Sequence, residues 1–206
     1  MSTDPGGNQA SRKGKRPARE RICETARDLF YQRGIRGVGV ELIASEAGTT
    51  KMSLYRNFAS KDELVAEYLC EQDREFWKWW DGLMEPLQGQ PEKQIEALFG
   101  ALRQACCNEG ARGCAFSNAA VELPDATHPG RQIVLNHHEK VRHRLRGICT
   151  EMQARDPETL GDALLLLISG ALMARLVFDS GDILDSVCKS VRSLLHSDMG
   201  PVREKS

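Results

Sequence analysis

Residues 43–64 read IASEAGTTKMSLYRNFASKDEL and contain the parts of a helix-turn-helix in order. A first short helix stops at Gly48, Thr50 stands where a helix N-cap is wanted, and Lys51 begins a second short helix. Residues 60–63, Ser-Lys-Asp-Glu, form a capping box that starts a further helix. Two short helices joined by a tight, glycine-containing turn have the geometry that places the second helix in the major groove of DNA.

The second short helix, residues 51–58, is predicted to have a polar and basic outer face. Leu54 and Phe58 lie four residues apart and therefore share the inner face. An arginine such as Arg56 can read guanine with two hydrogen bonds, or it can bind phosphate alone. The residues predicted to turn outward are Lys51, Ser53, Arg56 and Asn57.

Helical patterns continue on both sides of this stretch. Apolar residues recur at helical spacing from Pro17 to Gly34, where a left-handed C-cap is wanted, and the capping box opens a helix that runs to about Met84. Because no strand pattern or repeat is found, the predicted fold class is all-α. Further helices are predicted over roughly 95–108, 116–123, 133–152, 157–178 and 182–196.

Charge divides the chain into two parts. Residues 11–61 hold 12 Lys+Arg against 5 Asp+Glu, a net charge of +7, which leaves −8 for the rest of a chain whose total is −1. Such a division is expected when only one part meets a polyanion such as nucleic acid. Residues 1–16 are read as a disordered basic arm, which either adds phosphate contacts or is a solvated tail with no role. We therefore predict a three-helix DNA-binding domain over 17–62 and a larger helical effector-binding and dimerisation domain over 63–206.

This stretch resembles the tetracycline-repressor (TetR) family. The resemblance is specific over about residues 19–69, and beyond them only the helical plan and the segment GCAFSNAAVE, 113–122, are similar to a subset of that family. It implies a homodimeric bacterial repressor, not an enzyme, which a small-molecule effector releases from double-stranded operator DNA. The matches that carry it are Ile43-Ala44, Ala47-Gly48, Lys51, Leu54-Tyr55-Arg56, Phe58 and Ser60-Lys61-Asp62-Glu63-Leu64.

The resemblance also implies which residues contact DNA. Tyr55 matches a residue that contacts phosphate, and Lys61 matches a second one at the N-terminus of the next helix. Val38 and Gly39 stand where family members often have hydroxyl residues, which puts one backbone contact in doubt. Asn57 stands where tyrosine or histidine is common, so an altered sequence preference is expected. The predicted DNA-contacting residues are Thr50, Lys51, Met52, Ser53, Tyr55, Arg56, Asn57 and Lys61.

Aromatic residues are concentrated just after the DNA-binding stretch. Trp77, Trp79 and Trp80 fall within four positions and cannot all face one core. In such regulators the helical body encloses an effector pocket, although ordinary core packing is the competing interpretation of each residue. Glu122, His137 and His138 are further polar candidates to orient a ligand. The predicted ligand-lining residues are Phe76, Trp77, Trp80, Phe99, Phe116, Asn118 and Met173.

The last two helices predict a homodimer, because residues 157–196 carry more apolar surface than one monomer can cover. The longest apolar run, 163–168, is too short and too interrupted to span a membrane, and the N-terminus lacks the apolar centre of a secretory signal. A cytoplasmic protein with no membrane partner is expected.

No catalytic signature, cofactor motif or metal site stands out, and the seven cysteines include no C-x-x-C pair. Two alternatives stay open beside the ligand-controlled repressor. One is a redox- or metal-sensing regulator that uses Cys106, Cys107 and Cys114. The other is a helical interaction protein whose three-helix unit binds another protein rather than DNA, against which the +7 segment argues.

Overall fold

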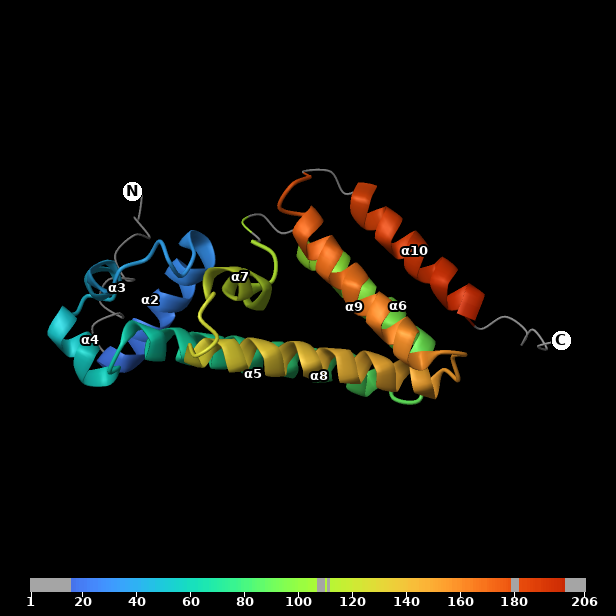
Figure 1. The fold of residues 1–206 in the computed structure, drawn as a ribbon, viewed down its shortest axis with the longest axis horizontal. Helices are drawn as coiled ribbons and strands as arrows, with labels where there is room; N and C mark the ends of the chain where they lie inside the picture. The colour runs from blue at the N-terminus through green and yellow to red at the C-terminus, as the bar shows by residue number, and fades with distance from the viewer. Residues whose placement is uncertain (1–15, 107–109, 111, 179–181, 199–206) are drawn as a thin grey trace, which may run out of the picture. The chain divides into compact units, whose positions relative to one another are not determined.

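The computed structural model describes residues 16–106, 110, 112–178 and 182–198, and every regular element in this part of the chain is helical (Figure 1). The all-α prediction is confirmed. The predicted arm covers residues 1–16, and its residues 1–15 lie outside the described part of the chain. The elements are α2 (Ala18–Arg33), α3 (Val40–Glu46), α4 (Lys51–Asn57), α5 (Lys61–Met84), the 3-10 helix η1 (Glu85–Leu87), α6 (Pro91–Cys106), α7 (Ala115–Glu122), α8 (Pro129–Glu151), α9 (Pro157–Ala174) and α10 (Asp182–Asp198).

The chain forms two compact units. The first unit comprises Met1–Gln72 and Asn118–Val134, and the second comprises Asp73–Ser117 and Leu135–Ser206. Helices α5, α7 and α8 each contribute residues to both units. The functional division into residues 17–62 and 63–206 stays a prediction.

In the first unit, α2, α3 and α4 pack against one another. Their inward positions follow the helical spacing seen in the sequence, so that Ile22, Ile43 and Leu54 are completely buried. Helix α2 ends as predicted at Gly34, whose φ of 82° lies in the left-handed region that favours glycine. The sequence therefore specifies this three-helix unit closely.

In the second unit, α6, α9 and α10 pack around the aromatic end of α5 and the last four turns of α8. The core is apolar, with Trp80 almost completely buried and Ile95, Leu145 and Leu164 completely buried. Helix α9 ends at Ala174, four residues earlier than predicted, and α8 begins at Pro129, four residues before the first apolar position used to predict it. Helix ends that carry polar residues leave little periodicity to detect.

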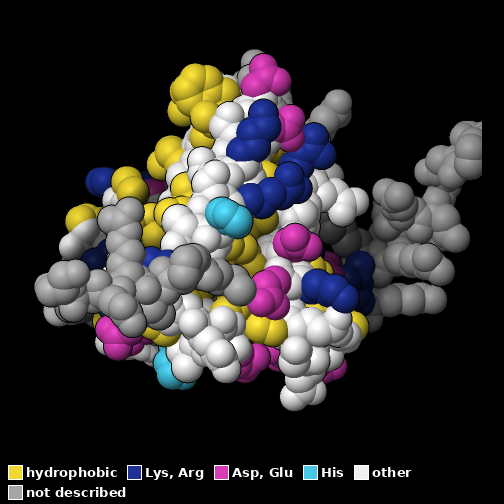
Figure 2. Space-filling view, turned by 90° about the vertical axis from the view of Figure 1, so that its right-hand side faces the viewer, with side chains coloured by type: hydrophobic (Ala, Val, Ile, Leu, Met, Phe, Trp, Pro, Cys, Tyr) yellow, Lys and Arg dark blue, Asp and Glu magenta, His cyan; other side chains and the backbone are white. Residues whose placement is uncertain are grey.

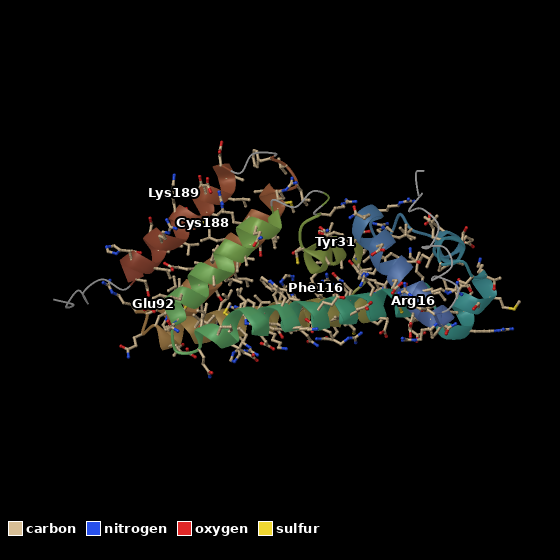
Figure 3. All side chains as sticks on the ribbon, turned by 180° about the vertical axis from the view of Figure 1, so that it is seen from behind. Arg16, Tyr31, Glu92, Phe116, Cys188 and Lys189 are labelled. Atoms are coloured by element: carbon tan, nitrogen blue, oxygen red, sulfur yellow. The ribbon has the colours of Figure 1, made fainter. Side chains whose placement is uncertain are left out.

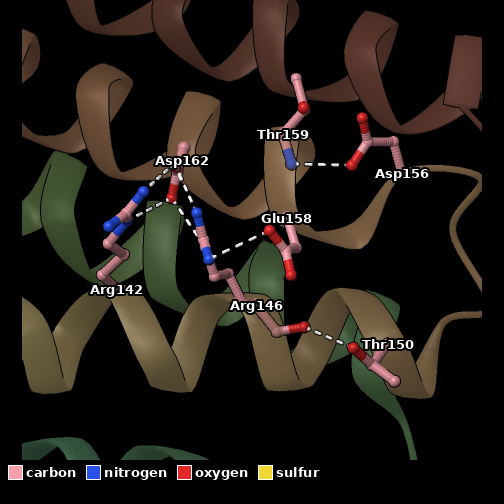
Figure 4. Close-up of polar contacts among 7 residues, drawn as sticks. All are labelled: Arg142, Arg146, Thr150, Asp156, Glu158, Thr159 and Asp162. Carbon is pink, nitrogen blue, oxygen red and sulfur yellow. Dashed lines mark hydrogen bonds and ion pairs between the residues drawn. The ribbon is translucent and has the colours of Figure 1, made fainter.

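Arginine side chains of α8 bind a carboxylate of α9 (Figure 4). Arg146 donates to both oxygens of Asp162 at 2.9 and 2.8 Å, and Arg142 donates to the same two oxygens. These hydrogen bonds hold the pKa of the Asp162 carboxyl well below its usual range. The predicted start of α9 is confirmed, because the Asp156 side chain accepts from the Thr159 N–H at 3.0 Å.

Helices α8 and α9 lie close together at Gly161. A Cβ atom at this position would lie 2.7 Å from Arg146 Cγ and 2.9 Å from both Arg146 Cα and its backbone N. Two of these three atoms belong to the backbone and cannot rotate away. We expect Gly161→Ala to lower the free energy of unfolding by about 1–3 kcal/mol through overpacking.

Chemical denaturation monitored by circular dichroism measures this change. Gly147→Ala on α8 is the matched control, because a Cβ there meets no atom within 4 Å. The control should raise stability by roughly 0.5–1 kcal/mol, since glycine disfavours a helix interior. Equal or higher stability for Gly161→Ala than for wild type would show that the helices are not held this closely.

Helix α9 leaves much of its apolar surface uncovered within one chain. Among its 18 residues only Leu160, Gly161, Leu164 and Ala171 are buried. Leu166 is 71% exposed, and beyond the helix Val177 is 69% and Phe178 51% exposed. Figure 2 shows hydrophobic side chains reaching the surface at its upper left, beside charged ones.

Helix α9 is long and apolar enough to cross a membrane, and among the described residues it is the one helix with that length and composition. The core helices of soluble proteins can have the same length and composition, so this property alone does not indicate a membrane protein.

Candidate nucleic-acid interface

The turn between α3 and α4 is held by a side chain of α2. Arg21 Nη1 donates to the carbonyl oxygens of Ala47 and Gly48 at 2.9 and 3.0 Å. Gly48 has a φ of 60°, which the tight turn requires, and Thr50 accepts from the Ser53 N–H at 3.1 Å as the N-cap of α4. The predicted helix-turn-helix is thus present with its predicted cap. Sequence reasoning missed Arg21, because one arginine on an amphipathic helix carries no signal of its distant partner.

The outer face of α4 carries long side chains. Met52 is 67% and Tyr55 44% exposed, and Lys51 and Arg56 are also exposed. Arg56 Nη2 lies 3.7 Å from Met52 Sδ, so both side chains extend from the same face one turn apart. This face is available to a partner of the first unit.

Ser53 and Asn57 differ from the predicted outward orientation. Both are half-buried, and Asn57 Nδ2 donates to the Ser53 carbonyl oxygen at 2.8 Å. The Asn57 side chain is short enough to bond back to its own helix, and this bond makes its amide less available to a partner outside the helix. Arg56, by contrast, bonds to no backbone group among the described contacts.

Lys51 forms an ion pair with Glu41 of α3. The hydrogen bond and the charge of Glu41 raise the pKa of Lys51, and those of Lys51 lower the pKa of Glu41. Lys51 therefore stays a cation at the start of α4. Because both side chains are well exposed, the pair can exchange for other partners at small cost.

Lys61, at the start of α5, is half-buried rather than free. Its Nζ donates to the Ile35 carbonyl oxygen at 2.6 Å and lies 6.0 Å from the centre of the Phe30 ring. Burial lowers the pKa of Lys61, opposed by the charges of Asp62 and Glu122. Ser60 accepts from the Glu63 N–H at 3.1 Å, as the predicted capping box requires, and the Glu63 carboxylate accepts from the N–H of Ala59, one residue before the expected partner.

Glu122, a predicted ligand-orienting candidate, instead binds the loop between α2 and α3. Its Oε2 accepts from the Arg36 N–H at 2.8 Å. A Cβ on Gly34 would come within 3.0 Å of that same carboxylate. Glu122 ends α7 and belongs to the first compact unit.

The residues predicted to line a ligand pocket are dispersed. Trp77 and Trp80 are buried in the core of the second unit, Phe76 is partly buried against that core, and Phe116 is also buried. Trp79 is 42% exposed, as the crowding of three tryptophans predicted. Asn118 belongs to the first unit, and Met173 is 56% exposed on α9.

Two cavities are each lined by one of the predicted ligand-lining residues. Phe99 lines a groove of about 450 Å³ between α6 and α10, together with Cys188 and Lys189 (Figure 3). Trp80 lines a smaller cavity of about 170 Å³, whose other lining residues are apolar and polar in turn: Met84, Gln94, and from α8 His143, Arg144, Gly147, Ile148 and Glu151.

An aromatic cluster surrounds a buried histidine in the second unit. The His137 ring stacks on Phe116 with 3.6 Å between centroids, and its Nδ1 lies 2.7 Å from Asp73 Oδ1. Trp77 Nε1 donates to that same oxygen at 2.8 Å. Burial lowers the pKa of His137, and this effect outweighs the hydrogen bond and charge of Asp73, which raise it. The lowered pKa favours the neutral ring at pH 7.

The proposed sensor cysteines are only partly described. Cys107 lies outside the described residues, Cys106 is the last residue of α6, and Cys114 is half-buried and free. Within the residues that the structure covers, no group of three or more His, Cys, Asp or Glu side chains could hold a metal ion.

Comparison with known proteins agrees with this geometry. Residues 22–68 match the family described as bacterial regulatory proteins, tetR family. The chain is 25% identical over 164 residues to the HTH-type transcriptional repressor DhaR of Mycobacterium sp. (strain GP1), covering 76% of this chain and 81% of that protein. It is 29% identical over 128 residues to the repressor KstR2 of Mycolicibacterium smegmatis, covering 61% and 58%.

A solved structure extends the match to nearly the whole chain. The TetR-family transcriptional regulator SCO4454 from Streptomyces coelicolor is 30% identical, with a TM-score of 0.84, over 89% of this chain and 96% of that one. The predicted family, fold and non-enzymatic nature are confirmed by these matches. The protein is therefore a soluble bacterial DNA-binding transcription regulator that belongs to the TetR family.

Proposed function

We propose that this regulator is a homodimeric repressor that binds a palindromic operator through α4 and is released by a small, mainly apolar effector. The observation that carries the proposal is the exposed face of α4, where Tyr55 and Arg56 extend from a helix whose turn and caps are fixed by hydrogen bonds. The proposed DNA-contacting residues are Thr50, Lys51, Met52, Ser53, Tyr55, Arg56, Asn57 and Lys61.

We propose distinct roles within this set. Arg56 reads a base edge, because it is exposed and its planar guanidinium matches guanine. Tyr55 and Lys61 bind phosphate, and the partly buried Lys61 keeps two of its three donors for that contact while one holds Ile35. Asn57 contributes least, since its amide is already bonded to the helix backbone.

The proposed dimer interface is formed by α9 and α10. Leu166, Met173 and Val177 follow one another at helical spacing and are exposed in the single chain. Gly170 lies between them on the same stripe, and a Cβ there would meet no atom within 4 Å. A second copy related by a two-fold axis would cover this stripe and would match the symmetry of a palindrome.

The proposed effector acts near Trp77 and Trp80. The cavity beside Trp80, about 170 Å³, is comparable in size to one that admits a single aromatic ring, roughly 150 Å³. Helix α5 starts with Lys61 in the first unit and continues through Trp80 in the second. A ligand that shifts the far end of this helix would therefore also move its DNA-binding end. We place the protein in the cytoplasm, where operator and effector meet.

We predict that effector binding and operator binding oppose each other. A compound that lowers operator affinity must bind the operator-bound form more weakly by the same factor, typically worth about 1–3 kcal/mol. Tryptophan fluorescence, titrated with and without operator duplex, measures the two affinities. Trp77→Ala and Trp80→Ala should weaken ligand binding, whereas the exposed Trp79→Ala should not. Equal affinity in both titrations, or no effect of the two core variants, would contradict the proposed site.

The redox or metal alternative stays open for Cys106, Cys107 and Cys114. Burial raises the pKa of the Cys149 thiol to about 11, which argues only against Cys149 as an additional sensor. Sensitivity of operator binding to diamide or zinc is the observation that would favour a sensor using Cys106, Cys107 or Cys114.

A further inference from the structure

The loop between α2 and α3 is held by two side chains from distant parts of the first unit. Glu122, the last residue of α7, accepts from the Arg36 N–H at 2.8 Å. Lys61, the first residue of α5, donates to the neighbouring Ile35 carbonyl oxygen at 2.6 Å. The two consecutive loop residues Ile35 and Arg36 are thus bonded through their backbone to a lysine ammonium and a glutamate carboxylate, respectively.

The loop needs such support because α3 has no side-chain cap of its own. Its N-cap is Gly39, which makes no side-chain hydrogen bond. The backbone before it is shaped around the carboxylate, since a Cβ on Gly34 would come within 3.0 Å of Glu122. Val38 is completely buried, so a shift of the loop would also disturb the packing under α3.

We propose that Glu122 is a positioning residue for DNA binding. Its carboxylate fixes the loop that leads into α3 and thereby the angle at which α3 and α4 are presented, although Glu122 itself binds no DNA. The inference rests on DNA binding by the family and adds a residue well outside the matched stretch, residues 22–68. Helix α7 is therefore a working part of the DNA-binding unit.

The sign of the effect separates positioning from simple electrostatics. A carboxylate in the DNA-binding unit repels phosphate, so removing its charge should tighten DNA binding if charge were its only influence. Loss of positioning has the opposite sign, because the loop gains freedom that DNA binding must then remove. Weaker binding after removal of a negative charge therefore requires the positional role.

Four variants of the full-length protein test the proposal on an operator duplex obtained by selection from random DNA. Glu122→Gln keeps an oxygen that can accept from Arg36, whereas Glu122→Ala removes it and Glu122→Asp keeps the charge but shortens the reach. We expect Glu122→Gln to bind as tightly as wild type or more tightly. Glu122→Ala and Glu122→Asp should bind about 5- to 10-fold more weakly, the effect of one lost hydrogen bond. Glu20→Ala, at an exposed acidic residue of α2, is the matched control and should not weaken binding.

Hydrogen exchange at the Arg36 amide gives a second readout without DNA. Exchange should be faster in Glu122→Ala and Glu122→Asp than in wild type and Glu122→Gln. If the alanine variant does not fold, the comparison of the aspartate and glutamine variants decides the question. Operator affinities of Glu122→Ala and Glu122→Asp equal to or above that of wild type, or unchanged exchange at Arg36, would overturn the proposal while leaving DNA binding by wild type intact.

Discussion

Replacing Arg56 by alanine is expected to weaken operator binding by about 1–3 kcal/mol and to relax the sequence preference at one base pair in each half-site. The guanidinium is exposed on α4, and its one described contact is with the thioether of Met52, so it is available to a base. The largest loss is expected if Arg56 makes a bidentate contact with guanine. A uniform loss over all sequences would instead assign it to phosphate.

Mobility shift at several salt concentrations measures this effect together with those of Tyr55→Phe and Lys61→Ala. Lys61→Ala removes a cation from phosphate and should reduce the magnitude of the slope of log affinity against log salt by about one, whereas Tyr55→Phe removes an uncharged hydroxyl and should lower affinity without changing the slope. Lys78→Ala, which removes an exposed positive charge from the second unit, is the control and should leave the slope unchanged. Unchanged affinity in all three variants, with helical circular dichroism intact, would rule out α4 as the recognition helix.

Introducing glutamate at both Leu166 and Met173 is expected to convert the proposed dimer into monomers. Both side chains are exposed in the single chain on the stripe that we assign to the dimer interface. Two-fold symmetry places four new carboxylates in one apolar contact, where burying unpaired charge costs several kcal/mol. The dimer dissociation constant should therefore rise on the order of 100-fold or more.

Sedimentation velocity at micromolar protein concentration measures this change. Leu135→Glu, at an apolar residue of α8 that is also exposed but lies off the stripe, is the control and should remain dimeric. The double variant should also lose operator affinity, because one three-helix unit then binds one half-site alone. A wild-type protein that is monomeric and still binds DNA tightly would contradict the interface.

Local signals allowed the first unit to be predicted closely. The cap at Thr50, the capping box at Ser60 and the glycine that ends α2 each depend on neighbours within four residues. Such contacts are set by short-range geometry, so residue spacing suffices to predict them. The Asp156 cap that starts α9 belongs to the same class.

Contacts between distant residues could not be predicted in this way. Glu122 binds Arg36 across 86 positions, and Lys61 binds Ile35 across 26. Nothing in the spacing of these residues indicates their partners, so the sequence predicts Glu122 near a ligand and Lys61 on a phosphate without indicating their contacts within the chain. The Arg21 contacts that hold the helix-turn-helix turn were missed for the same reason.

The ligand-lining set was predicted from residue type alone, and the structure disperses it. Aromatic side chains serve equally well as core residues, and Trp80 and Phe116 are almost completely buried. Met173 is predicted as apolar pocket lining, yet its side chain on α9 is exposed in the single chain. Residue type without the fold cannot separate a pocket, a core and an oligomer interface.

Hydroxyl-radical footprinting of the wild-type protein on a selected operator, combined with the stoichiometry of the complex, tests most directly that this is a two-fold symmetric DNA-binding regulator. Two protected half-sites should be related by a palindrome, with centres one helical turn, about 34–36 Å, or a multiple of it apart. The complex should contain an even number of chains. A single protected site bound by one chain, or salt-sensitive binding without any protected sequence, would contradict this account.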